Sequence, residues 1–211
     1  MVYSKDIDVF CSFIQVSRET IISLKYYESH LKIANERLNL VGKTTINNVW
    51  IRHFLDSAQV IDSIDENDKS LVDIGSGAGF PGIVLAIILK ERKNKIKIRV
   101  IEKNKKKINF IKEIINKLKL DVTIVNQNVF EQNQKIWDDV IITRAFKPLE
   151  IILELMHKKA NNWKKTFLFL GKTGNEQLLQ ASKSWDIKYK QRMSITSSDS
   201  KIIEIYKLIK K

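Results

Sequence analysis

The stretch LVDIGSGAGFPG, from Leu71 to Gly82, joins an apolar run to a cluster of glycines. Gly75, Gly77 and Gly79 follow the spacing GxGxG, and the cluster also satisfies GxGxxG when Gly82 is counted. A strand that turns sharply into a helix beneath a ligand requires residues without a Cβ at the turn. The spacing therefore predicts a nucleotide-cofactor loop, and the helix after it should point its unpaired N–H groups at the ligand. It does not decide which cofactor binds.

Short β-branched runs alternate with amphipathic stretches after residue 65, which is typical of βαβ units and a parallel sheet. Seven strands are predicted, over residues 70–75, 95–102, 122–126, 138–145, 165–171, 187–195 and 201–209, with helices after the first five. Only the turn 196–200 separates the last two strands, so they should form an antiparallel hairpin at one end of the sheet. We therefore expect an α/β fold with a Rossmann-like seven-stranded sheet over residues 66–211, preceded by a helical extension over residues 1–65.

The composition limits the compartment and the partners. Lys and Arg number 37 against 24 Asp and Glu, a net charge of +13. This excess fits a polyanionic partner if it gathers on one face, whereas a general bias towards lysine explains it equally well. The single cysteine, Cys11, excludes an intrachain disulfide and fits a reducing cytoplasm. Without a signal peptide, a membrane-spanning run or metal-ligand spacing, we expect a cytoplasmic monomer that binds no membrane and no metal.

Two carboxylates narrow the choice of cofactor. Glu102 ends the second predicted strand, where a carboxylate can accept hydrogen bonds from the ribose of any adenosine cofactor. Asp73 lies inside the first strand, where dinucleotide-binding strands usually carry an apolar residue. It either helps organise the loop near a methionine ammonium group or caps loop N–H groups from within the core, and both roles can hold together. Together with the terminal hairpin, Asp73 favours S-adenosylmethionine over NAD.

The residue inventory makes two methylation chemistries improbable. Methylation of cytosine C5 needs a thiolate, and the only cysteine, Cys11, lies in the helical extension. Methylation of exocyclic amines commonly uses an Asp/Asn-Pro-Pro-aromatic loop, whereas Pro81 and Pro148 are the only prolines. An acceptor that is already nucleophilic, such as a ring nitrogen, needs in-line alignment rather than a general base. We therefore assign no catalytic residue.

Six segments of the chain resemble the RsmG family, also called GidB: ERLNLVG, IRHFLDS, VDIGSGAGFPG, EKNKKKINFIKE, ITRAF and LFLGK. The resemblance runs from about His30 to the C-terminus. It implies a class I methyltransferase with an N-terminal helical cap, S-adenosylmethionine as methyl donor, and N7 of a guanine in the decoding-region loop of 16S rRNA, in the small ribosomal subunit, as acceptor. A small-molecule methyltransferase and a non-catalytic rRNA-binding assembly factor are the alternatives, and the intact glycine turn argues against the second.

The resemblance also implies positions for the site residues. With the residues argued above, the predicted cofactor set is Asp73, Gly75, Gly77, Gly79, Phe80, Glu102, Val129, Phe130 and Arg144. Arg52, His53, Lys107 and Lys172 match other characteristic positions of the family and are assigned to RNA binding or to holding the site together. A packing role is the stronger interpretation for His53, and Asp56 is spaced to pair with Arg52 four residues earlier.

The chain departs from its relatives before the fourth strand. Where they commonly read Arg, Ala or Val, and Glu, this sequence has Asn128, Val129 and Phe130. Recognition of adenine there loses a guanidinium and a carboxylate. We therefore expect a backbone contact at this position in place of a side-chain contact.

Overall fold

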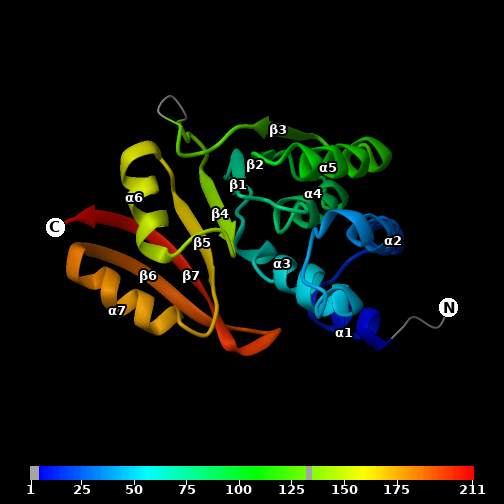
Figure 1. Cartoon of the computed structure of the whole chain (residues 1–211), viewed down its shortest axis with the longest axis horizontal. Helices are drawn as coiled ribbons and strands as arrows, with labels where there is room; N and C mark the ends of the chain where they lie inside the picture. The colour runs from blue at the N-terminus through cyan, green and yellow to red at the C-terminus, as the bar shows by residue number, and fades with distance from the viewer. Residues whose placement is uncertain (1–4, 132–134) are drawn as a thin grey trace.

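A computed structural model describes residues 5–131 and 135–211 and contains one seven-stranded sheet (Figure 1). The strand order is β3-β2-β1-β4-β5-β7-β6. The first five strands run parallel, and β7 pairs antiparallel with both β5 and β6. This confirms the predicted sheet and its terminal hairpin. The strands are β1 (Ser70–Ile74), β2 (Lys97–Glu102), β3 (Val122–Asn126), β4 (Val140–Arg144), β5 (Lys165–Leu170), β6 (Trp185–Ser194) and β7 (Ser197–Lys210).

Two of the predicted connections are wrong. Helices follow four strands, namely α4 (Gly82–Glu91), α5 (Lys105–Leu118), α6 (Leu149–Lys159) and α7 (Gly174–Ser184). The described residues between β3 and β4, 127–131 and 135–139, contain no helix, because this Asn- and Gln-rich stretch offers no apolar periodicity. The hairpin turn lies at Ile195 and Thr196 rather than at 196–200, since the serines that suggest a turn continue β7.

The sheet is covered on both faces, as its apolar strands require. Alternate residues of β1 enter two different cores: Leu71 packs with α4 and α5, and Val72 packs with α6 and α7. Figure 1 shows these helix pairs on opposite sides of the sheet. Residues 82–89 of α4 are apolar and buried, and only Lys90 and Glu91 at its end are charged, so the helix lacks a polar face along most of its length.

The N-terminal residues form α1 (Lys5–Phe13), α2 (Arg18–Leu38) and a series of short helical segments up to Ser63, among them α3 (Asp56–Ala58). Ser17 caps α2, because its side chain accepts a hydrogen bond from the Thr20 amide, and Asn39 ends it in the left-handed conformation. One apolar cluster joins α1 and α2 to α4 and α5. The division at residue 65 stays a prediction, and the core extends across it. No helix in the described ranges is both long and apolar enough to cross a membrane.

Candidate cofactor site

A cavity of about 370 Å³ lies at the carboxyl ends of the parallel strands, beside the point where the strand order reverses between β1 and β4. Ligands of open α/β sheets bind at such a switch point. Four segments line the cavity: Gly75 and Gly77 after β1, residues 101–103 with Lys107, residues 127–130 after β3, and residues 145–147 after β4. Of the predicted cofactor residues, it brings together Gly75, Gly77, Glu102, Val129 and Phe130.

The glycine loop requires glycine for different reasons at two positions. Gly77 has φ +60°, and a Cβ there would meet nothing closer than the Gly75 carbonyl oxygen at 3.9 Å. A larger side chain at Gly77 would therefore project into open space beside the cavity. Gly79 has φ +100°, and a Cβ there would lie 2.6 Å from the Tyr27 hydroxyl oxygen. The loop thus leaves room for a ligand at one glycine and for a helix of the N-terminal region at the other.

Glu102 supports the glycine loop as well as lining the cavity. Its Oε2 accepts a hydrogen bond from the Gly77 amide at 3.0 Å, and its Oε1 accepts from the amides of Lys103 and Asn104 at 2.8 Å each. The side chain is buried at 8% exposure. These three bonds hold the carboxylate at the strand end, where its remaining lone pairs can accept from a ribose hydroxyl.

Asp73 is fully buried and caps the glycine loop from the side of the core. Its Oδ2 accepts hydrogen bonds from the Ser76 hydroxyl at 2.6 Å and the Gly82 amide at 2.8 Å, while Oδ1 has no partner. Burial raises the pKa of this carboxyl from 3.8 to about 6, although both hydrogen bonds oppose the rise. The first amide of α4 therefore bonds to Asp73 and does not point at a ligand, contrary to our expectation for this helix.

Phe80 does not line the cavity. Its ring stacks with that of Tyr27, at 5.4 Å between centroids, and with that of His53, at 4.9 Å. The Tyr27 hydroxyl donates a hydrogen bond of 2.5 Å to the Ala78 carbonyl, so helix α2 holds the glycine loop directly. Sequence reasoning missed Tyr27, since no local pattern links it to a loop 51 residues away.

His53 is buried inside this stack. Its Nε2 lies 3.0 Å from the Thr45 hydroxyl, and the ring is 6% exposed. Burial lowers the pKa of His53 from 6.5 to about 3, and the charges of Arg144 and Arg52 add to the shift. The neutral ring packs against Phe80, which agrees with the packing interpretation; its assignment to RNA stays a prediction.

Arg144, at the end of β4, is held by the N-terminal region. Its Nε donates to Asp56 Oδ2 at 2.6 Å, and its Nη2 donates to the Arg52 carbonyl at 2.6 Å. Asp56 therefore pairs with Arg144 and not, as its spacing suggested, with Arg52. The other oxygen of Asp56 accepts from Thr196 at 2.7 Å and from Ser194 at 3.2 Å. This network, the Asp56 hub, joins β4, the π-helical turn Trp50–Leu55 and the β6–β7 turn.

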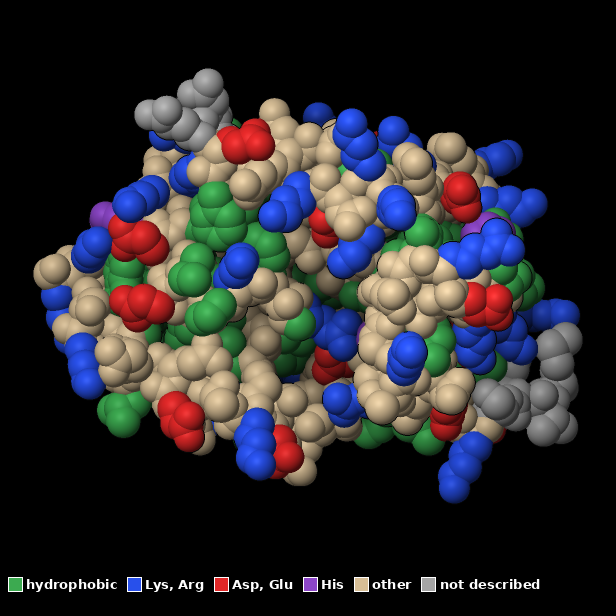
Figure 2. All heavy atoms as spheres, in the orientation of Figure 1, with side chains coloured by type: hydrophobic (Ala, Val, Ile, Leu, Met, Phe, Trp, Pro, Cys, Tyr) green, Lys and Arg blue, Asp and Glu red, His purple; other side chains and the backbone are tan. Residues whose placement is uncertain are grey.

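The predicted RNA residues are spread around the site. Lys107 lines the cavity, while Arg52 and Lys172 are exposed outside it. Figure 2 shows lysine and arginine side chains over the whole of the face in view rather than in one patch. Net charge alone therefore does not delimit a binding surface for a polyanion.

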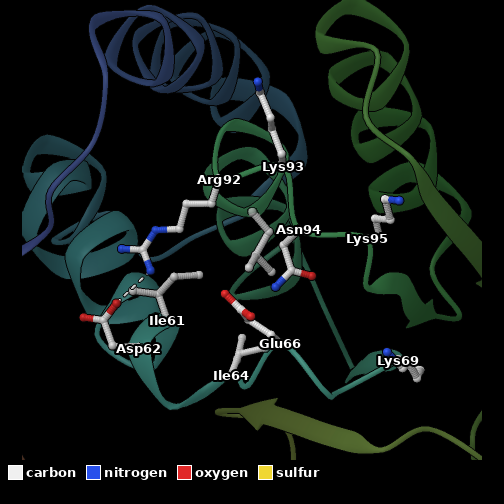
Figure 3. Close-up of a pocket in the computed structure, with 10 residues that line it drawn as sticks. Ile61, Asp62, Ile64, Glu66, Lys69, Arg92, Lys93, Asn94 and Lys95 are labelled. Atoms are coloured by element: carbon white, nitrogen blue, oxygen red, sulfur yellow. Dashed lines mark hydrogen bonds and ion pairs between the residues drawn. The ribbon is translucent and has the colours of Figure 1, made fainter.

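A second hollow of about 470 Å³ lies at the amino ends of β1 and β2, opposite the ends that face the cofactor cavity. Its cationic side chains do not converge. Figure 3 shows Arg92 turned to Asp62, which it pairs with at 2.7 Å, while Lys69, Lys93 and Lys95 point in different directions. This hollow therefore does not form a single anion site.

The seven-stranded sheet with its antiparallel β7 and its switch-point cavity has the class I methyltransferase fold. TrmK of M. capricolum, solved with S-adenosylhomocysteine, superposes with a TM-score of 0.54 at 21% identity and covers 72% of this chain and 67% of its own. The 16S rRNA methylase RmtB superposes with a TM-score of 0.55 at 13% identity, covering 95% and 80%. Likeness at these identities shows the fold alone.

The chain belongs to the GidB family, rRNA small subunit methyltransferase G, whose family model matches residues 20–206. A relative from Pelagibacter ubique (strain HTCC1062), ribosomal RNA small subunit methyltransferase G, is 40% identical over 198 residues, which cover 93% of this chain and 92% of the relative. The family predicted from six short segments is therefore confirmed.

Proposed function

We propose that this protein transfers a methyl group from S-adenosylmethionine to N7 of a guanine in 16S rRNA of the small ribosomal subunit, as a monomer in the cytoplasm. The observation that carries the proposal is the family match over residues 20–206, together with an intact glycine-loop cavity within those residues. The sulfonium methyl group of the cofactor supplies the electrophile.

The residues of the cavity fit this cofactor. Open space at Gly77 leaves room for it, and Glu102 faces the cavity as an acceptor for the ribose. Val129 has no hydrogen bond from its amide within the described residues. That amide can donate to adenine, which supports the expected backbone contact. Asp73 is enclosed below the loop, so its part is to hold the loop's shape.

The reaction needs little from the protein beyond alignment. The lone pair of guanine N7 forms the new N–CH3 bond as the S–CH3 bond breaks, and the electron pair of that bond stays on sulfur. No proton has to leave, since N7 carries none. The chain must therefore bind both reactants in line and exclude water, which agrees with the absence of an assigned general base.

The test is transfer of labelled methyl from S-adenosylmethionine to small subunits that lack the modification, followed by nucleoside analysis. Label in 7-methylguanosine supports the donor, the substrate and the acceptor atom together. Label in another nucleoside would contradict the acceptor atom. No label in the subunits, despite measured cofactor binding, would contradict the substrate and favour a small-molecule methyltransferase or an assembly factor.

The variant Gly77→Asp tests the cavity itself. The new carboxylate projects toward the cofactor and lies close to Glu102, so both binding and transfer should be abolished while the fold is retained. Gly42→Asp is the matched control, because Gly42 is exposed and lies outside the cavity. Retained transfer in Gly77→Asp would contradict the location of the site.

A further inference from the structure

The β6–β7 hairpin, at one edge of the sheet, buries one of its faces and exposes the other. On the buried face, Trp185 and Ile205 belong to the apolar cluster that includes residues of α6 and α7 (Figure 1). Successive side chains of a strand point to opposite faces. Lys188 and Lys190 therefore lie on the face turned away from α7, and both are exposed.

A β-bulge adds an aromatic ring to this exposed face. Lys188 pairs with Lys207 while Tyr189 pairs with Ile205, so Tyr206 is an extra residue in β7. Ile205 is fully buried, whereas Tyr206 and Lys207 after it are both exposed, the tyrosine to 49%. The bulge thus presents a tyrosine ring beside lysines of both strands.

The lysines of this face lie where their charge destabilises the hairpin. Lys188 and Lys207 are directly opposite each other, and like charges in that position oppose strand pairing. Within the described residues, no hydrogen bond or ion pair engages the ammonium groups of these two lysines or of Lys190. Lysines can protect an edge strand from pairing with another chain, but β7 is an inner strand. The acids of this face, Asp186 and Glu204, are fewer than its cations, so a positive excess remains for an anionic ligand.

The exposed face leads toward the cofactor cavity. Arg192 follows Lys188 on the same face, four residues further along β6. A strand rises about 3.3 Å per residue, so these two cations mark a line of about 13 Å along the hairpin. Beyond them, Ser194 binds in the Asp56 hub, at the end of β4 next to residues 145–147 of the cavity. An RNA strand with one base at the cavity can therefore continue along the hairpin.

We propose that the exposed face of the hairpin binds a single-stranded segment of the RNA substrate, with Tyr206 stacking on an unpaired base and Lys188, Lys190 and Lys207 binding the adjoining phosphates. The proposal rests on the proposed function and adds to it an RNA surface outside the cofactor cavity. Proteins that bind single-stranded RNA combine aromatic rings for the bases with cations for the backbone.

The test uses a single-stranded RNA oligonucleotide with one 2-aminopurine, whose fluorescence is quenched when the base stacks. Tyr206→Leu removes the ring and keeps an apolar side chain, so it should weaken binding by roughly fivefold to one hundredfold and reduce quenching. Tyr206→Phe keeps the ring and should behave like the unchanged protein. Tyr189→Leu is the matched control, because Tyr189 is 37% exposed on the opposite face of the same hairpin. It should leave RNA binding unchanged.

Lys207→Gln separates RNA binding from the stability of the hairpin. It removes one phosphate contact and also the repulsion from Lys188. RNA should therefore bind more weakly, while the urea midpoint of unfolding stays the same or rises. A lower midpoint with unchanged RNA affinity would assign Lys207 to the fold and contradict its place in the RNA surface.

Unchanged RNA affinity and quenching in Tyr206→Leu would overturn the proposal, as would an equal loss in Tyr189→Leu. Calorimetry should give the same dissociation constant for S-adenosylmethionine in all these variants, since the substituted residues lie outside the cofactor cavity. RNA binding is read without methyl transfer, so the two proposals can fail separately. Methyl transfer to small subunits without RNA binding that depends on Tyr206 would overturn the hairpin surface and leave the proposed function standing.

Discussion

Tyr27 shows how one side chain of the N-terminal helices can control the cofactor loop. It donates a hydrogen bond to the Ala78 carbonyl and packs on Phe80. Burial holds the pKa of this phenol well above its usual value, so the hydroxyl keeps its proton and remains a donor. We therefore expect Tyr27 to act on the cofactor through the loop, as a positioning residue.

Replacing Tyr27 with phenylalanine keeps the ring stack and removes the donor. The Ala78 carbonyl is left without this partner, so the free energy of unfolding should fall by about 1–3 kcal/mol, and S-adenosylmethionine should bind more weakly. Tyr26→Phe is the control, because the Tyr26 hydroxyl makes only a 3.4 Å contact with His30. Chemical denaturation and calorimetry measure both effects, and unchanged cofactor affinity in Tyr27→Phe would contradict the positioning role.

Asp73 and His53 give the stability of the protein opposite dependences on pH. The folded-state pKa of Asp73 is raised to about 6, so between pH 4 and 6 the folded state binds more protons there than the unfolded state, and stability falls as pH rises. The pKa of His53 is lowered to about 3, so its contribution to stability rises with pH between about 3 and 6.5. The two effects oppose each other over most of that range.

Asp73→Asn should therefore make the stability rise more steeply between pH 4 and 6. The removed contribution is at most about 3 kcal/mol at neutral pH, from a shift of roughly two pKa units. Denaturation at a series of pH values measures it. Asp62→Asn, at an exposed position, should leave the slope nearly unchanged, and an equal slope in Asp73→Asn and the unchanged protein would refute the raised pKa.

Among the secondary-structure elements, the turn between β6 and β7 depends on the Asp56 hub. Replacing Asp56 with asparagine leaves the guanidinium of Arg144, which is 19% exposed, without its carboxylate. We expect a loss of about 1–3 kcal/mol, between the values for exposed and fully buried pairs. Hydrogen exchange should also accelerate in residues 192–198.

The matched control for this prediction is Asp62→Asn. Asp62 pairs with Arg92 at the surface, where the two side chains are 77% and 37% exposed. Such a pair contributes about 0–1 kcal/mol. Equal losses in the two variants, measured by urea denaturation, would show that the Asp56 hub does not brace the turn.

Local patterns in the sequence predict the strands because buried parallel strands are continuous apolar runs, as in residues 140–142 and 167–170. They also predict the glycine loop and Glu102, whose spacing follows from one βα unit. Contacts between distant elements leave no periodic signal. The Arg144–Asp56 pair joins residues 88 positions apart, and the serines 197, 198 and 200 suggest a turn but pair within a long hairpin.

At the scale of the whole molecule, the net charge is +13, and we expect the effect of each lysine on RNA affinity to depend on where it lies. RNA affinity should fall with salt in proportion to the phosphates that are neutralised. Lys188→Gln combined with Lys207→Gln should lower the slope of log affinity against log salt by about 1.5, for two phosphate contacts. The control is Lys93→Gln combined with Lys95→Gln, which removes two positive charges at the hollow of Figure 3, where the lysines point in different directions. This double variant should leave the slope unchanged. Equal changes of the slope in the two double variants would indicate non-specific attraction between the protein and RNA.

The position of β7 has a consequence for folding during synthesis. This last strand lies between β5 and β6, and the turn before it completes the Asp56 hub around Arg144. Chains emerge from the ribosome N-terminus first, so β5 and β6 leave the ribosome before the strand that lies between them. Until β7 emerges, the nascent chain lacks both the strand between β5 and β6 and the hydrogen bond from Thr196 to Asp56. A protein proposed to modify ribosomes would thus complete its cofactor crevice only after residues 197–210 have left the ribosome that synthesises it.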